Sequence, residues 1–127
     1  MELYREQILE HWKHPQHWGT LAHATHTAAR DNPLCGDRIA VGLIVRAGHV
    51  ADVRFTGEGC AVSIATMSLL TEQLIGKSAE DIAALGAEHI TTLLGATPSP
   101  SRMQCALLGL STTQAALGEK SEHKTTY

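Results

Sequence analysis

The sequence has no long apolar stretch and no concentration of positive charge. Its longest apolar run, Ile39 to Val45, is far shorter than the roughly 20 residues that a membrane-spanning helix needs. Lysine and arginine never stand side by side, and the formal net charge is −3, so the chain lacks the clustered positive field of a nucleic-acid surface. Charged residues begin at position 2, which is unlike a secretory signal. We therefore expect a cytoplasmic protein with neither a membrane nor a nucleic-acid partner.

Cysteine is also scarce. The three cysteines, Cys35, Cys60 and Cys105, cannot all pair within one chain. In a reducing compartment they serve more often as thiols, metal ligands or catalytic groups than as disulfide halves. A chain of 127 residues buries roughly two-thirds of the surface that its unfolded form exposes, so it needs neither disulfides nor metal to fold. We expect one domain over residues 1–118 and a flexible polar tail over residues 119–127.

Apolar residues recur at helical spacing in five segments. The predicted helices span Leu3 to Trp12, Ala61 to Ile75, Ser78 to Leu85, Ala87 to Leu94 and Pro100 to about Leu117. Ser78 and Ser99 stand where they would cap the helices that follow them. The first helix should bury a stripe formed by Leu3, Tyr4, Ile8, Leu9 and Trp12. The helix over 61–75 should bury one side, formed by Ile64, Met67, Leu70 or Thr71, and Leu74.

Two alternating apolar runs, Ile39 to Val45 and Ala51 to Phe55, predict a β-hairpin. Both runs place their apolar residues at odd positions, so partners that share a face must have numbers with an even sum. The register that satisfies this condition pairs Val45 with Ala51, Leu43 with Val53, and Val41 with Phe55. It leaves a three-residue loop, 47–49, with Gly48 available for a positive φ. A weaker pattern within residues 21–29 predicts an edge strand.

The open end of this hairpin should gather the candidate functional residues. Extending the ladder places Cys35 within one step of Cys60, and Asp37 follows two residues after Cys35. Cys60 would begin the helix over 61–75, where backbone N–H groups and the helix dipole favour an anion. The neighbouring glycines, at 57 and 59, would let the backbone approach a bound group closely.

Three thiolates and one carboxylate would complete a four-ligand shell for a soft or borderline metal. The third thiolate would come from Cys105, in the first turns of the last predicted helix. The spacing contains no C-x-x-C pair, so it leaves two interpretations open. The cysteines either share one metal site or fill the core separately, as buried cysteines often do.

Three motifs carry a more specific resemblance. The stretches NPLCGD, GEGCAVSIATMSLL and RMQCALL resemble the cysteine motifs of the iron–sulfur cluster scaffold family, the IscU, SufU and NifU N-terminal-domain proteins. The opening LYREQILEHWKHPQHWGTL resembles the family's first helix and loop, so the match covers about residues 2–118. The resemblance implies an α+β fold of the SufE/NifU-like sandwich type, with a three-stranded antiparallel sheet packed on helices. The domain over 1–118 would then be a single NifU-like N-terminal domain.

The resemblance also implies a function. Members accept persulfide sulfur from a cysteine desulfurase, combine it with iron into a transient 2Fe–2S cluster, and pass the cluster to apo-proteins. By position, Cys35, Asp37, Cys60 and Cys105 match the family's ligands for cluster or zinc, and Cys105 matches its sulfur-accepting cysteine. A carboxylate on a thiolate site suits a transient cluster, because it binds iron less tightly than sulfur does.

The chain departs from the IscU pattern in two places. Gln104 stands where IscU proteins have a histidine before the third cysteine, and in this it resembles SufU. The alternative to a scaffold is therefore a SufU-type zinc-containing sulfurtransferase that activates its desulfurase, although the segment between the second and third cysteines is closer in length to IscU. The proline motif for chaperone recognition is missing as well, which argues against recruitment of the dedicated Hsp70 system. A third interpretation is a non-catalytic domain in which the same residues hold structural zinc.

Two further groups of residues have alternative interpretations. Five histidines lie between His11 and His26, and they form either a second metal site or a solvated helix end and loop. Arg38 and Arg102 stand near the thiols in sequence. They either stabilise the negative charge of a persulfide or cluster, or they are ordinary surface residues.

Overall fold

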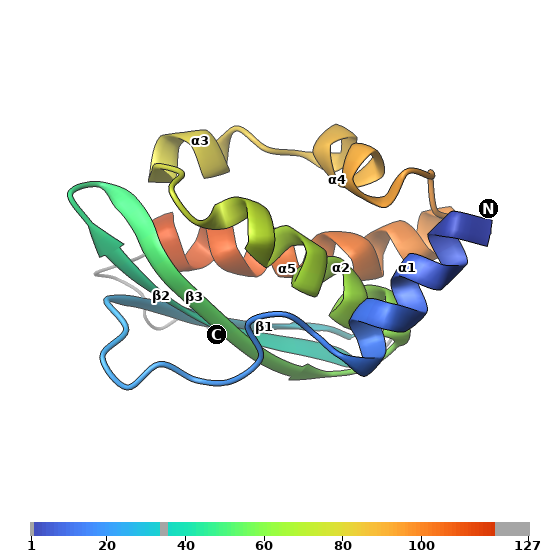
Figure 1. Ribbon diagram of the computed structural model, residues 1–127, viewed down its shortest axis with the longest axis horizontal. Coiled ribbons are helices and arrows are strands. Elements are labelled where there is room, and N and C mark those ends of the chain that lie inside the picture. Colours follow the sequence, from blue (N-terminus) through green and yellow to red (C-terminus); the bar gives the residue numbers. More distant parts are fainter. Residues whose placement is uncertain (1, 34–35, 119–127) are drawn as a thin grey trace.

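A three-stranded antiparallel sheet forms one side of the computed structural model, which describes residues 2–33 and 36–118 (Figure 1). The strands run in the order β1-β2-β3 and comprise β1 (His26–Asn32), β2 (Asp37–Arg46) and β3 (His49–Glu58). The helices are α1 (Glu2–Lys13), α2 (Ala61–Leu74), α3 (Ala79–Ala83), α4 (Ala87–Leu94) and α5 (Pro100–Gly118). The predicted α+β class and antiparallel sheet are confirmed, whereas the tail over 119–127 lies outside the described residues.

The middle of the hairpin has the predicted register and its turn does not. Leu43 pairs with Val53 and Val41 pairs with Phe55, as predicted. Near the turn the pairing shifts, so that Val45 lies opposite Val50 and not opposite Ala51. The predicted three-residue loop is therefore wrong. The turn contains two residues, Ala47 and Gly48, and both have a positive φ, of 52° and 81°. This conformation is typical of the tight hairpin turns that match the twist of the strands.

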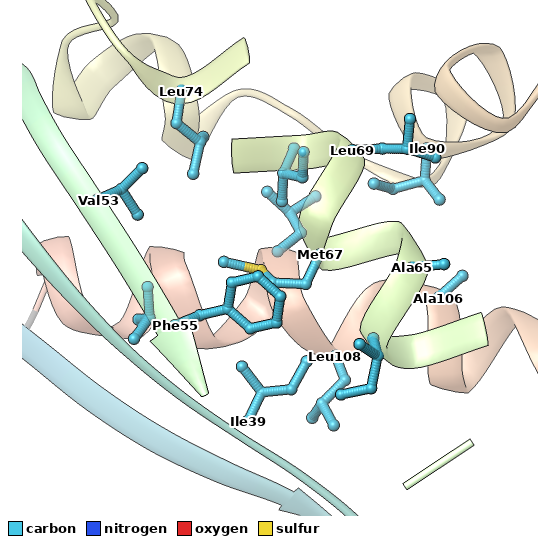
Figure 2. Packing of buried hydrophobic residues seen from close by; sticks show 14 of the residues in the cluster. Ile39, Val53, Phe55, Ala65, Met67, Leu69, Leu74, Ile90, Ala106 and Leu108 are labelled. Atoms are coloured by element: carbon cyan, nitrogen blue, oxygen red, sulfur yellow. The ribbon is translucent and has the colours of Figure 1, made fainter. Parts of the chain in front are cut away.

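The helices lie in two layers over one face of the sheet (Figure 1). α2 and α5 pack directly on the strands, α1 lies beside α2, and α3 and α4 cover the side away from the sheet. The residues predicted on the buried side of α2 are all buried, and burial extends to its other sides because α2 lies between these layers. In the core Phe55 of β3 and Met67 of α2 point toward one another, both with no exposed surface (Figure 2). Gly109 of α5 leaves room for Met67, because a Cβ atom there would overlap its side chain.

The helix ends follow the predicted capping. The Ser78 hydroxyl accepts a hydrogen bond from the backbone N–H of Asp81 over 3.1 Å, and the Ser99 hydroxyl accepts one from Arg102 over 3.4 Å. The predicted stripe of α1 is only partly correct. Ile8 is buried, whereas Leu3, Leu9 and Trp12 are 79%, 41% and 46% exposed. None of the helices in the described part of the chain is both long and apolar enough to cross a membrane.

Candidate metal centre

Three of the four predicted ligands meet at one end of the sheet. Asp37 is the first residue of β2, Cys60 precedes the first residue of α2 and Cys105 lies in the second turn of α5. One carboxylate oxygen and the two sulfur atoms all lie within 4.8 Å of one another. In the described part of the chain, no other set of three potential metal ligands comes together in this way. The fourth predicted ligand, Cys35, lies outside the described residues.

The hairpin places Asp37 beside Cys60. The register opposes Arg38 to Glu58, so the next step along the ladder brings Asp37 to the segment that links β3 to α2. The Asp37 Oδ1 atom accepts a hydrogen bond from the backbone N–H of Cys60 over 2.9 Å. The Cys60 thiol donates to Asp37 Oδ2, with 3.7 Å between sulfur and oxygen. One oxygen therefore holds the start of α2 and the other faces the site.

Gly59 makes the close approach of Asp37 possible. Its φ of 139° is unfavourable for a residue with a side chain, and a Cβ atom at this position would overlap the Asp37 carboxyl group. The sequence predicted that the glycines at 57 and 59 leave room for a bound group. In the structure Gly59 leaves room for the side chain of a neighbouring strand. At Gly57 a Cβ atom would lie 2.5 Å from the carbonyl oxygen of Arg38, so this glycine allows close pairing of the strands.

The two sulfur atoms have different surroundings. The Cys60 side chain is half-buried, and its sulfur lies 3.9 Å from the hydroxyl of Ser63, which itself donates to the Cys60 carbonyl over 3.1 Å. Cys105 is fully buried, and its thiol faces the carbonyl oxygen of Ser101 at 3.8 Å. Cys60 is therefore the more accessible sulfur of the two.

The charges of the site favour a cation. Asp37 and both cysteines can each carry a negative charge, and Asp37 and Cys105 are at most 1% exposed. Negative charges this close repel one another strongly where water is excluded, so a positive ion among them lowers the energy. Ligand atoms around a single zinc or iron ion lie about 2.0–2.3 Å from it, and so less than about 4.6 Å apart. The observed separations approach this value, and the oxygen and sulfur donors suit either metal.

The two candidate arginines have different partners. Arg38 forms an ion pair with Asp31 over 2.8 Å on the exposed surface. The thiolate charges of Cys60 and then of Cys105 raise the pKa of Arg102 above its usual value, and hydrogen bonds to the two sulfurs contribute. The structure thus associates Arg102, and not Arg38, with the described sulfurs.

The histidine-rich segment docks on α2. The Nδ1 atom of His11 lies 2.7 Å from the Ser68 hydroxyl, and that of His17 lies 3.0 Å from the Thr71 hydroxyl. The Ser68 hydroxyl also accepts the backbone N–H of Gln16 over 2.7 Å. Neither predicted interpretation describes these contacts. In the described structure these two histidines form no metal site, and they are half-buried structural residues.

Comparison with known proteins gives consistent matches over nearly the whole chain. The family model described as NifU-like N terminal domain matches residues 3–126. A relative named iron-sulfur cluster assembly scaffold protein IscU, from Aquifex aeolicus, is 34% identical over 116 residues, which cover 90% of this chain and 73% of the relative. A relative named zinc-dependent sulfurtransferase SufU, from Bacillus subtilis, is 32% identical over 123 residues, which cover 84% and 83%.

Solved structures share the fold. One, titled as a hypothetical protein, superposes with a TM-score of 0.80 at 28% identity and covers 92% of this chain and 98% of its own. A second is titled as a putative iron-sulfur cluster assembly scaffold protein for the SUF system from Fervidobacterium islandicum. It has a TM-score of 0.75 at 26% identity, and the match covers 91% and 97% of the two chains.

Proposed function

The chain belongs to the NifU-like N-terminal domain family, and from this premise we propose that it is an iron–sulfur cluster assembly scaffold. It accepts sulfur from a cysteine desulfurase in the cytoplasm, combines it with iron into a transient 2Fe–2S cluster, and passes the cluster to apo-proteins. The observation that carries this proposal is the convergence of Asp37, Cys60 and Cys105 within 4.8 Å at one end of the sheet.

The proposed roles of these residues follow from their chemistry. Cys35, Cys60 and Cys105 supply thiolates, which are strong ligands for iron. Asp37 supplies Oδ2, while Oδ1 stays hydrogen-bonded to the backbone of Cys60. This carboxylate would hold the cargo more weakly than a thiolate would. Such a mixed ligand set supports both assembly and release.

Cys105 is the proposed sulfur acceptor. Its thiolate attacks the outer sulfur of the desulfurase persulfide, and the sulfur–sulfur bond of the donor breaks as a new one forms on Cys105. The desulfurase cysteine leaves as a thiolate, so the exchange needs no external oxidant or reductant. Because Cys105 is fully buried, this role requires local opening of the site when the donor arrives.

Anaerobic reconstitution with iron, cysteine and a desulfurase tests the proposal. The expected result is the visible absorption of a 2Fe–2S centre, lost in Cys35→Ser, Cys60→Ser and Cys105→Ser. Cys→Ser changes at these three positions remove a thiolate ligand without a large change of volume. A protein that stays colourless under these conditions is not a cluster scaffold.

The second candidate is a zinc-containing sulfurtransferase. Two observations favour it: Gln104 is exposed on the turn of α5 that carries Cys105, and a zinc-dependent relative is 32% identical. This candidate predicts that the purified protein contains one zinc ion per chain. It also predicts that the protein stimulates a desulfurase without forming a cluster. A purely structural zinc predicts instead that chelation unfolds the protein. The apolar core, which extends through α2, α5 and the sheet, argues against that third candidate.

A further inference from the structure

Arg102 occupies a distinctive position at the metal centre. It lies three residues before Cys105 on α5, and residues at this spacing lie on the same face of a helix. Its backbone is fixed by Ser99, whose hydroxyl accepts its N–H over 3.4 Å. Cys105 is fully buried, whereas Arg102 is exposed. The guanidinium group therefore lies at the rim of the site and Cys105 lies beneath it.

The described partners of the Arg102 side chain are sulfur atoms. The thiolate charge of Cys60 raises the pKa of Arg102 most and that of Cys105 follows, and hydrogen bonds to both sulfurs contribute. The ion pairs found in the described residues join Arg38 to Asp31 and Arg54 to Asp52, and neither involves Arg102. Within the described part of the chain Arg102 forms no ion pair, so its guanidinium group is available for another anion.

We propose that Arg102 binds and orients the anionic sulfur that enters the site. The ligand class is a persulfide or polysulfide, whose outer sulfur carries negative charge. This inference rests on the proposed function for the identity of the donor. The preference for small anions beside Cys60 is the part of the proposal that does not depend on the identity of the donor.

The charge distribution of the site gives this residue a necessary task. Asp37 Oδ2 lies 3.7 Å from the Cys60 sulfur, so an incoming anion meets a carboxylate as well as the thiolates. The positive charge of Arg102 offsets this repulsion, and its planar group offers several N–H donors at once. When a thiolate takes the outer sulfur of the donor, the donor leaves as a thiolate and the new negative charge lies on the transferred sulfur. Arg102 is placed to stabilise that charge at the rim.

Alkylation of Cys60 tests the anion preference directly. The full-length chain, freed of metal by chelation, is treated with iodoacetate, which is anionic, and with iodoacetamide, which is neutral and of similar size. Mass spectrometry of the peptide that contains Cys60 gives both rates. Their ratio cancels any change in the reactivity of the thiolate itself. In Arg102→Gln the ratio of iodoacetate to iodoacetamide rates should fall about threefold at low salt, a typical size for one exposed charge.

Two matched variants complete this experiment. Arg102→Lys should retain most of the ratio, because it keeps the charge. Arg38→Gln removes a charge that is already paired with Asp31, and it should leave the ratio unchanged. The inference is overturned if Arg102→Gln keeps the wild-type ratio, or if Arg38→Gln lowers it equally.

Sulfur loading extends the test to the proposed ligand. With inorganic polysulfide as donor, persulfide formation at Cys60 and Cys105 should slow about threefold in Arg102→Gln, after correction for its iodoacetamide rate. An unchanged corrected rate overturns the assignment of this ligand class. If a desulfurase delivers no sulfur even to the wild-type chain, the proposed function fails, while the alkylation ratio still decides the role of Arg102.

Discussion

The carboxylate of Asp37 accepts the backbone N–H of Cys60 over 2.9 Å, and its other oxygen lies 3.7 Å from the sulfur of the same residue. The two residues are far apart in sequence, and the hairpin brings them together. Asp37 is 1% exposed, so this contact is part of the interior of the protein and contributes to folding as well as to the site. The two contributions can be separated by experiment.

The structural role of Asp37 predicts different stabilities for two substitutions. Asp37→Ala removes the acceptor and leaves the N–H of Cys60 without its partner, which should cost about 1.5–3 kcal/mol in the free energy of unfolding of the metal-free protein. Asp37→Asn keeps a carbonyl oxygen at that place and should cost less than about half as much. Chemical denaturation with a chelator present measures both. Equal losses would show that the hydrogen bond contributes little.

Gly59→Ala should damage the fold and the site together. The new Cβ atom would overlap the Asp37 carboxyl group, and the backbone would keep an unfavourable φ of 139°. We expect a loss of about 2 kcal/mol or more in stability and weaker zinc binding by calorimetric titration. Gly86→Ala is the control, because Gly86 has an ordinary φ and nothing within 4 Å of the new atom. It should leave zinc affinity unchanged and lower stability by about 0.5–1 kcal/mol, because Gly86 is the N-cap of α4 and alanine caps a helix less well than glycine. Wild-type zinc affinity in Gly59→Ala would contradict the role given to this glycine.

Gly109→Ala should affect the core and spare the site. A Cβ atom on α5 at this position would overlap the side chain of Met67 on α2, and the surrounding core has little room to adjust. Overpacking of this kind costs about 1–3 kcal/mol, which thermal unfolding would detect. The stoichiometry of bound zinc should remain that of the wild type. The prediction is contradicted if Gly109→Ala loses zinc binding but keeps its stability. That result would show that the packing of α5 does not hold Cys105 rigidly in the site.

The sequence could predict those parts of the fold that depend on regular patterns. Alternation with a period of two determined the register in the middle of the hairpin. The extension of that register to Cys35 stays a prediction, because Cys35 lies outside the described residues. The alternation failed at the turn, because the positive φ of Ala47 and the displaced Ala51 depend on local backbone energies that apolar alternation does not report. The environment of α2 also escaped prediction, since an apolar stripe cannot reveal a second layer of helices above it.

The sequence predicted which residues form the site better than it predicted how their side chains contact one another. The motifs named the residues, but the overlap of a Cβ atom at Gly59 with Asp37 depends on the three-dimensional course of the segment after β3. The sequence also could not distinguish Arg38 from Arg102, because both lie close to a cysteine along the chain. Only the folded structure shows that Arg38 pairs with Asp31.

The proposed scaffold function predicts that Asp37→Cys retains a cluster that the wild-type site releases. The substitution replaces the hard oxygen ligand by a thiolate, which binds iron more strongly, so transfer of a reconstituted cluster to an apo-ferredoxin should slow about tenfold or more. Asp37→Asn is the matched control, because it removes the charge without adding sulfur. In contrast to Asp37→Cys, it should not slow the transfer of the cluster. The substitution also removes the acceptor of the Cys60 N–H, so the transfer rate is compared at a temperature where both variants are folded. Transfer from Asp37→Cys at the wild-type rate would mean that the carboxylate does not control release.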